Sequence, residues 1–138
     1  MRTFKRIAVV PALLFGLGLV TAGCEPADQA KYDSTVDNFD GQITHNGEPV
    51  SFADMENVKL QLLYLETAEH FGVPIKPDGT FDIGWMPIGD YSATLEWKNT
   101  STDRNREGGP ATHGVPGGLT VLEGKTEYTV ELGENWKP

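Results

Sequence analysis

The sequence predicts an all-β protein folded as a single antiparallel β-sandwich of about seven short strands. Apolar and polar residues alternate with a period of two in several runs, which is typical of strands with one buried face. Clusters of Gly, Pro, Asn and Asp separate these runs, and no amphipathic helix of convincing length is present. Because a sheet with one apolar face needs a second layer to cover it, a two-layer sandwich follows.

The clearest strand signals lie in residues 73–98. Pro77-Asp78-Gly79 predicts a turn, because Pro presets φ, Asp bonds nearby backbone and Gly accepts a positive φ. One strand begins at Thr80, and another follows a break at residues 87–89. The apolar face of the first strand is Phe81, Ile83 and Trp85, and that of the second is Tyr91, Ala93, Leu95 and Trp97. We expect the pair to form a hairpin-like unit with one apolar face.

Other runs supply the remaining strands. Residues 39–44 alternate and precede Asn46-Gly47, a strong signal for a two-residue hairpin turn. Residues 58–65 predict a strand that is covered on both sides near its end, because Leu63 and Leu65 oppose its main apolar face. The final strands are expected at 119–122 and 126–132.

Residues 99–118 separate these last strands from the rest of the domain. They are rich in Gly, Asn, Thr and Pro, with few apolar side chains. A stretch of this length without strand or helix signals predicts a long loop, which on a rigid sandwich is a candidate surface for partner contact.

The N-terminal residues 1–23 have the pattern of a signal peptide. Three basic residues precede an uncharged apolar run at 7–20, which has the length of a signal-peptide core and is too short to span a membrane. The following Thr21-Ala22-Gly23-Cys24 resembles the lipobox of bacterial lipoproteins, which implies cleavage before Cys24 and attachment of lipid to it. The alternative is an ordinary secretory signal beside an incidental cysteine.

Cys24 is the only cysteine, so no intramolecular disulfide can form and the domain must be held by its core. The lipobox resemblance implies an exported protein, anchored by lipid to the cell membrane or outer membrane and facing the periplasm or the surface. Polar residues follow the cysteine. We expect residues 24–38 to be a flexible tether and residues 39–138 to be the sandwich domain.

The charge balance argues against two classes of partner. The chain has 11 Lys and Arg against 20 Asp and Glu, and removing the three basic residues before Cys24 changes the net charge from −9 to −12. Nucleic acids and anionic lipid headgroups bind clustered basic side chains. We therefore expect neither as a partner.

Five motifs share an order that belongs to a known type of domain: Gly41-Gln42-Ile43-Thr44, Asn46 to Val50, Val58-Lys59-Leu60, Pro77 to Ile83 and Pro87 to Tyr91. In this order the chain resembles carboxypeptidase regulatory-like domains, the transthyretin-related or prealbumin-like sandwiches, and is similar to short lipoproteins of planctomycete bacteria. The resemblance covers residues 39–132. It implies an Ig-like or transthyretin-like fold and, since the motifs are structural, it does not imply an enzyme.

These observations favour a non-catalytic envelope protein with a structural or protein-binding role, without catalytic residues or a cofactor. The alternative is a carbohydrate-binding module in which exposed Trp side chains stack on sugar rings of an envelope polysaccharide. The candidates are Trp136, Trp97 and Trp85. Trp85 and Trp97 lie in phase with apolar neighbours, which favours core packing, whereas Trp136 near the C-terminus is expected to be exposed.

A small metalloenzyme is the least favoured interpretation. His45 and Glu48 have the His-x-x-Glu spacing of zinc ligands, but they lie on a predicted turn, and a catalytic zinc needs three protein ligands. A site would require His70 and His113 to converge on this pair. No metal site is therefore predicted.

Overall fold

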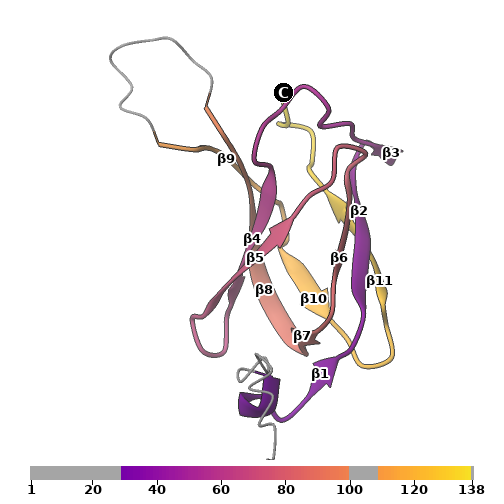
Figure 1. The fold of residues 1–138 in the computed structure, drawn as a ribbon, viewed down its shortest axis with the longest axis vertical. Coiled ribbons are helices and arrows are strands. Elements are labelled where there is room, and N and C mark those ends of the chain that lie inside the picture. The colour runs from indigo at the N-terminus through magenta and orange to yellow at the C-terminus, as the bar shows by residue number, and fades with distance from the viewer. Residues whose placement is uncertain (1–28, 100–108, 138) are drawn as a thin grey trace, which may run out of the picture.

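The computed structural model describes residues 29–99 and 109–137, whose regular secondary structure is almost entirely β-strand (Figure 1). The predicted signal peptide and Cys24 lie outside the described residues. A 3-10 turn, η1 (Gln29–Lys31), precedes the strands β1 (Thr35–Val36), β2 (Phe39–His45), β3 (Glu48–Pro49), β4 (Lys59–Tyr64), β5 (His70–Pro74), β6 (Thr80–Ile83), β7 (Met86–Pro87), β8 (Gly89–Trp97), β9 (Ala111–Gly114), β10 (Leu119–Val121) and β11 (Glu127–Glu131). Within the described ranges, no helix is both long and apolar enough to cross a bilayer.

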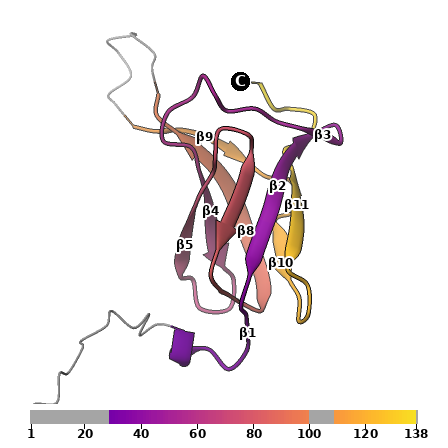
Figure 2. The ribbon, with the colours of Figure 1, turned by 45° about the vertical axis from the view of Figure 1, so that its right-hand side comes forward.

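Two larger sheets form the sandwich (Figure 2). The first has the order β10-β8-β4-β5, with β9 also paired to β8. The second has the order β11-β2-β3, with β6 also paired to β2, and a short β1-β7 pair joins them at one end. The predicted β-sandwich is confirmed.

The core is built from the alternating side chains that the sequence indicates. In β4 and β8, Leu60 pairs with Leu95 and Leu62 with Ala93, and all four residues are buried. Opposite them, the second sheet contributes Phe39, Ile43, Phe81, Tyr128 and Val130. The prediction that 58–65 is covered on both sides is wrong for Leu65, which is 59% exposed because it lies in the turn beyond β4.

Both predicted turns are present. Asn46 and Gly47 have φ values of 52° and 80°, as a hairpin turn between β2 and β3 requires. Gly79 has a φ of 82°, and a Cβ there would lie 2.2 Å from the carbonyl oxygen of Val50. Only glycine fits this position, because both the backbone conformation and the close approach exclude a side chain.

The expected hairpin between β6 and β8 is not formed. β6 pairs with β2 and β8 pairs with β4, so the two strands lie in different sheets. β6 ends at Ile83, and residues 84–88 carry the chain across the end of the sandwich. The two apolar faces therefore belong to opposite sheets and meet across the core.

One strand pair departs from the expected antiparallel pattern. β11 runs parallel to β2, with Tyr128 opposite Gly41 and Val130 opposite Ile43. Alternation of apolar residues reports which side of a strand is buried and is independent of strand direction. The sequence therefore located β11 without revealing its orientation.

The N-terminal part of the folded chain begins earlier than predicted. Residues 29–38 were expected to belong to a flexible tether, but η1 and β1 lie on the sandwich. Val36 is buried in the core, and the Tyr32 ring contacts those of Tyr64, Phe71 and Trp85. The prediction failed because these apolar residues are isolated among polar ones and show no periodicity.

The stretch 99–118 is also more structured than expected where it is described. β9 pairs with the last four residues of β8, from Thr94 to Trp97. The sequence of β9, Ala-Thr-His-Gly, has no apolar alternation, so this strand could not be predicted from the pattern of apolar residues. Residues 100–108 of the predicted loop lie outside the described residues.

Candidate functional site: a groove beside Trp97

An open groove of about 680 Å³ lies at the end of the sandwich where β8 finishes. Three strand ends and two loop segments form it. Val58, Pro74 and Trp97 supply apolar wall, while Asn99 and Pro110 come from the two described flanks of the 99–118 stretch. The groove therefore joins a rigid strand scaffold to the base of a loop, an arrangement in which proteins commonly place binding surfaces.

Trp97 is held in place by aromatic packing. Its ring meets Trp136 edge to face, with centroids 5.3 Å apart and planes at 79°. Trp136 in turn contacts Phe52 and His113, and the His113 ring nitrogen Nε2 lies 2.7 Å from the carbonyl oxygen of Leu132. Trp97 itself is half-buried, so one part of the ring is fixed while another lines the groove.

Paired charges surround this aromatic side chain. Lys59 and Glu96, which are register partners on β4 and β8, form an ion pair of 2.9 Å. Lys98 and Glu56 form another of 2.6 Å, and the hydrogen bond from Lys98 holds the pKa of Glu56 below its ordinary value. These pairs leave the groove nearly neutral, although the chain as a whole is strongly acidic.

The structure corrects the prediction for Trp136. It is only 6% exposed and belongs to the core, where its ring closes the end of the sandwich beneath Trp97. The prediction relied on the polar residues around it, Asn135 and Lys137, which are exposed. The backbone turns at Gly133, whose carbonyl accepts a hydrogen bond from the Trp136 N–H, and this turn directs the indole inward.

Trp85 lies at the opposite end of the sandwich. A small pocket of about 370 Å³ is lined there by Trp85, Tyr32, Phe71, Lys31, Glu69 and His70. Three of its polar side chains already bind one another, because Lys31 and Tyr32 both donate hydrogen bonds to the Glu69 carboxylate. These contacts hold the pKa of Glu69 below its ordinary value, chiefly through Lys31. This pocket therefore serves mainly to attach η1 to the turn between β4 and β5.

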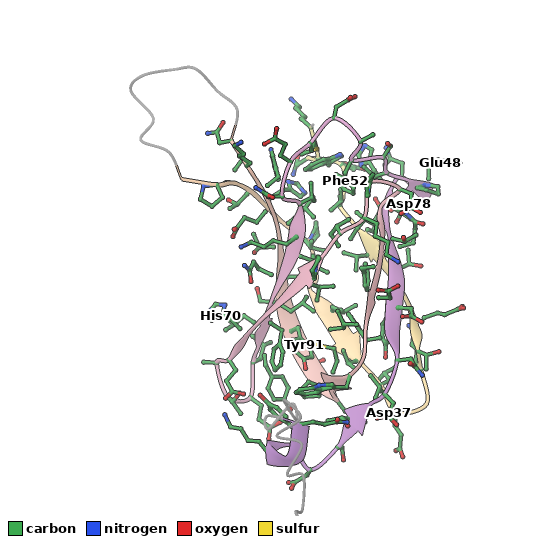
Figure 3. The ribbon with its side chains drawn as sticks, in the orientation of Figure 1. Asp37, Glu48, Phe52, His70, Asp78 and Tyr91 are labelled. Atoms are coloured by element: carbon green, nitrogen blue, oxygen red, sulfur yellow. The ribbon has the colours of Figure 1, made fainter. Side chains whose placement is uncertain are left out.

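The candidate metal residues do not come together. His45 and Glu48 face each other across the β2-β3 turn, whereas His70 begins β5 and His113 belongs to β9. Among residues 29–99 and 109–137, no three His, Cys, Asp or Glu side chains are grouped to hold a metal ion. Figure 3 shows the separation, with His70 far from Glu48.

Sequence reasoning named Trp97 but missed most of its surroundings. Asn57, Lys59 and Pro74 come from segments 23 to 40 positions earlier in the chain, and no motif marks them as residues of a binding site. The ion pair of Lys59 with Glu96 follows only once the register of β4 against β8 is known. Such a site is set by strand pairing, which local sequence patterns do not report.

No known protein family matches the sequence, and no curated protein matches it. The structure is similar to the crystal structure of a DUF3823 family protein from Parabacteroides merdae, with a TM-score of 0.41 and 22% sequence identity. The match covers 70% of this chain and 45% of the Parabacteroides merdae protein. This chain therefore spans less than half the length of the Parabacteroides merdae protein.

Proposed function

We propose that this chain is a non-catalytic, lipid-anchored β-sandwich of the bacterial cell envelope that binds a protein partner through the groove beside Trp97. The observation that carries the proposal is the groove itself, in which a half-buried, firmly packed Trp is surrounded by neutralised charges. Trp side chains that are fixed before binding lose little conformational entropy, and they are enriched among the residues that dominate protein interfaces.

The side chains that line the groove favour a segment of a protein as its ligand. Val58, Pro74, Pro110 and Trp97 offer an apolar strip, and the ion pairs at its side provide groups that can exchange partners with a bound chain. An apolar centre with a polar rim is the usual composition of a protein interface. A partner of this kind would bind without any catalytic group in the groove.

Anchoring of the chain is supported by its N-terminal sequence. The basic start, the short apolar run and Thr21-Ala22-Gly23-Cys24 resemble a lipoprotein signal, and Cys24 is the only cysteine. Attachment of two or three acyl chains would hold the protein stably on a membrane. The resemblance to carboxypeptidase regulatory-like domains fits the same proposal, since it implies an accessory module.

A carbohydrate ligand is the second candidate. Trp97 lines the groove together with Asn57 and Glu96, and an aromatic ring beside amide and carboxylate groups can stack on a sugar while hydrogen-bonding its hydroxyls. Trp136 and Trp85 no longer support this candidate, because Trp136 is buried and Trp85 lies at the other end.

The test is a binding assay with the full lipidated chain in detergent, immobilised and presented with envelope proteins and, separately, with envelope polysaccharides. Trp97→Ala should weaken the saturable binding at least tenfold, since an interface Trp commonly contributes about 2 kcal/mol or more. Trp85→Ala is the matched control, because it removes a half-buried Trp at the other end.

The two candidates give different outcomes. Binding by the protein fraction that protease treatment abolishes supports a protein partner, and binding by the polysaccharide fraction supports a carbohydrate module. Equal loss of binding in Trp97→Ala and Trp85→Ala would show that Trp97 does not belong to the binding site. The anchor is tested separately, since Cys24→Ser should move the chain from the detergent phase to the aqueous phase on phase separation.

A further inference from the structure

The end of the sandwich opposite the groove is where the N-terminal segment is attached. β1 pairs with β7, and the backbone N–H of Ile88 donates to the carbonyl of Ser34 at 3.0 Å. Lys31 and Tyr32 also bind the Glu69 carboxylate, which lies in the turn between β4 and β5. The chain from η1 to β1 is therefore attached to this end of the sandwich rather than carried on a free tether, and Figure 1 shows β1 and β7 at the same end.

Few residues separate this attachment from the proposed anchor. Cys24 lies five positions before Gln29. A chain of five residues spans at most about 18 Å even when fully extended, at about 3.6 Å per residue. A lipid on Cys24 would thus hold the attached end of the sandwich within a short distance of the bilayer.

The same end carries the exposed large hydrophobic side chains of the described chain. Leu65 is 59% exposed and Leu122 is 51% exposed. The Leu65 N–H donates to the carbonyl of Asp90, and Leu122 follows Val121, which pairs with Gly89. Both leucines therefore flank the beginning of β8, on turns that project at the end where β1 lies (Figure 2).

Charge at this end selects the kind of lipid surface. Its exposed acidic residues outnumber the basic ones: Asp33, Asp37, Glu66, Asp90 and Glu123 against Lys31 and Lys125. An anionic headgroup layer would repel this end, whereas a zwitterionic layer would not. Contact must then come from the acyl anchor and from apolar side chains at headgroup level.

We propose that the η1 end of the sandwich rests on the bilayer, with Leu65 and Leu122 in contact with zwitterionic lipid headgroups and the Trp97 groove facing away from the membrane. The inference rests on the proposed lipidation of Cys24. Trp97 and Gly89 are the two ends of β8, a strand of nine residues. At about 3.3 Å per residue they are separated by roughly 26 Å, enough to keep the groove clear of the headgroups.

The test measures the depth of single labels on the full lipidated chain in phosphatidylcholine vesicles. Cysteines introduced by Thr67→Cys and Glu123→Cys lie close to the two leucines, and Ala53→Cys is the control near the groove end; all three positions are exposed. Since the thiol of Cys24 would be occupied by lipid, an environment-sensitive dye would react only at the new cysteine. Spin-labelled lipids should quench the dye at 67 and 123 at least threefold more than at 53.

Two further arms make the result decisive. Leu65→Ser combined with Leu122→Ser should reduce quenching at 67 while the chain still floats with the vesicles, and phosphatidylglycerol in the vesicles should reduce it as well. Equal quenching at 53 and 67 on vesicle-bound protein would overturn the orientation and leave the anchor standing. The anchor, and this inference with it, would be overturned by either of two results. One is that the unlabelled chain does not float with the vesicles, and the other is that Cys24→Ser floats to the same extent as the unsubstituted chain.

Discussion

Replacing Trp136 by Ala tests whether the C-terminal segment is part of the core. The side chain is 6% exposed and packs against Phe52, Trp97 and His113. The substitution removes nearly the whole indole from a buried position without changing any charge. We expect a large loss in the free energy of unfolding together with a change in the shape of the Trp97 groove.

The magnitude follows from the buried area. An aromatic side chain buries about 150–250 Å², which at about 25 cal/mol per Å² corresponds to roughly 4–6 kcal/mol. This is an upper bound, because the unfolded chain already hides part of the ring. We therefore expect a loss of about 3 kcal/mol, the lower part of the range for Trp→Ala in cores.

Urea unfolding followed by far-ultraviolet circular dichroism measures this loss without relying on Trp emission. Trp136→Phe is the matched control, since it keeps an aromatic ring beside Trp97 and should lose no more than about half as much stability as Trp136→Ala. A loss below about 0.5 kcal/mol for Trp136→Ala, within the range of ordinary surface changes, would show that the indole does not close the core.

Three further substitutions test other parts of the account. Gly41→Ala should cost about 2–3 kcal/mol by overpacking, because a Cβ would lie 2.2 Å from the Phe81 ring and 2.5 Å from the carbonyl oxygen of Tyr128; a neutral result in urea would contradict this close packing of Phe81 and Tyr128 around Gly41. The Glu131 carboxylate accepts hydrogen bonds from the N–H groups of Gly47, Asn46 and Gly133 and from the Thr44 hydroxyl. These bonds, that from Gly47 above all, lower the pKa of Glu131 from 4.5 to about 2. The contribution of the Glu131 carboxylate to stability is thus fully present above pH 4.5 and lost as pH falls towards 2. Glu131→Gln should therefore be less stable than the unsubstituted chain at pH 7, and this difference in stability should disappear between pH 4.5 and 2. A difference that does not change with pH would refute the lowered pKa of Glu131. Glu69→Gln should loosen η1 and speed amide hydrogen exchange at Ile88, which donates to Ser34, whereas unchanged exchange would show that the Glu69 contacts do not hold the segment.

The sequence was most informative where turn chemistry and alternation agreed. Asn46-Gly47 and Pro77-Asp78-Gly79 form the expected turns, and the strands that start at Phe39 and Thr80 begin where predicted. These signals are local, because each depends on the φ preference of one or two residues or on which side of a strand is buried.

Pairing between strands could not be predicted in the same way. The crossing from β6 to β8 between sheets and the parallel direction of β11 depend on contacts between residues far apart in the sequence. The same limitation explains the candidate site. Trp97 was visible as an aromatic residue on a strand, but its support by Trp136 depends on a backbone turn at Gly133, and its polar neighbours depend on strand register.

Photo-crosslinking on cells that carry the full chain tests the binding proposal most directly. A photoreactive residue at Asn57, an exposed position lining the groove, should give a discrete adduct with an envelope partner, and Trp97→Ala should abolish it. The same probe at Thr67, at the other end of the sandwich, should give no such adduct. An adduct of equal yield from both positions, or one that persists in Trp97→Ala, would contradict the assignment of the groove as the binding site.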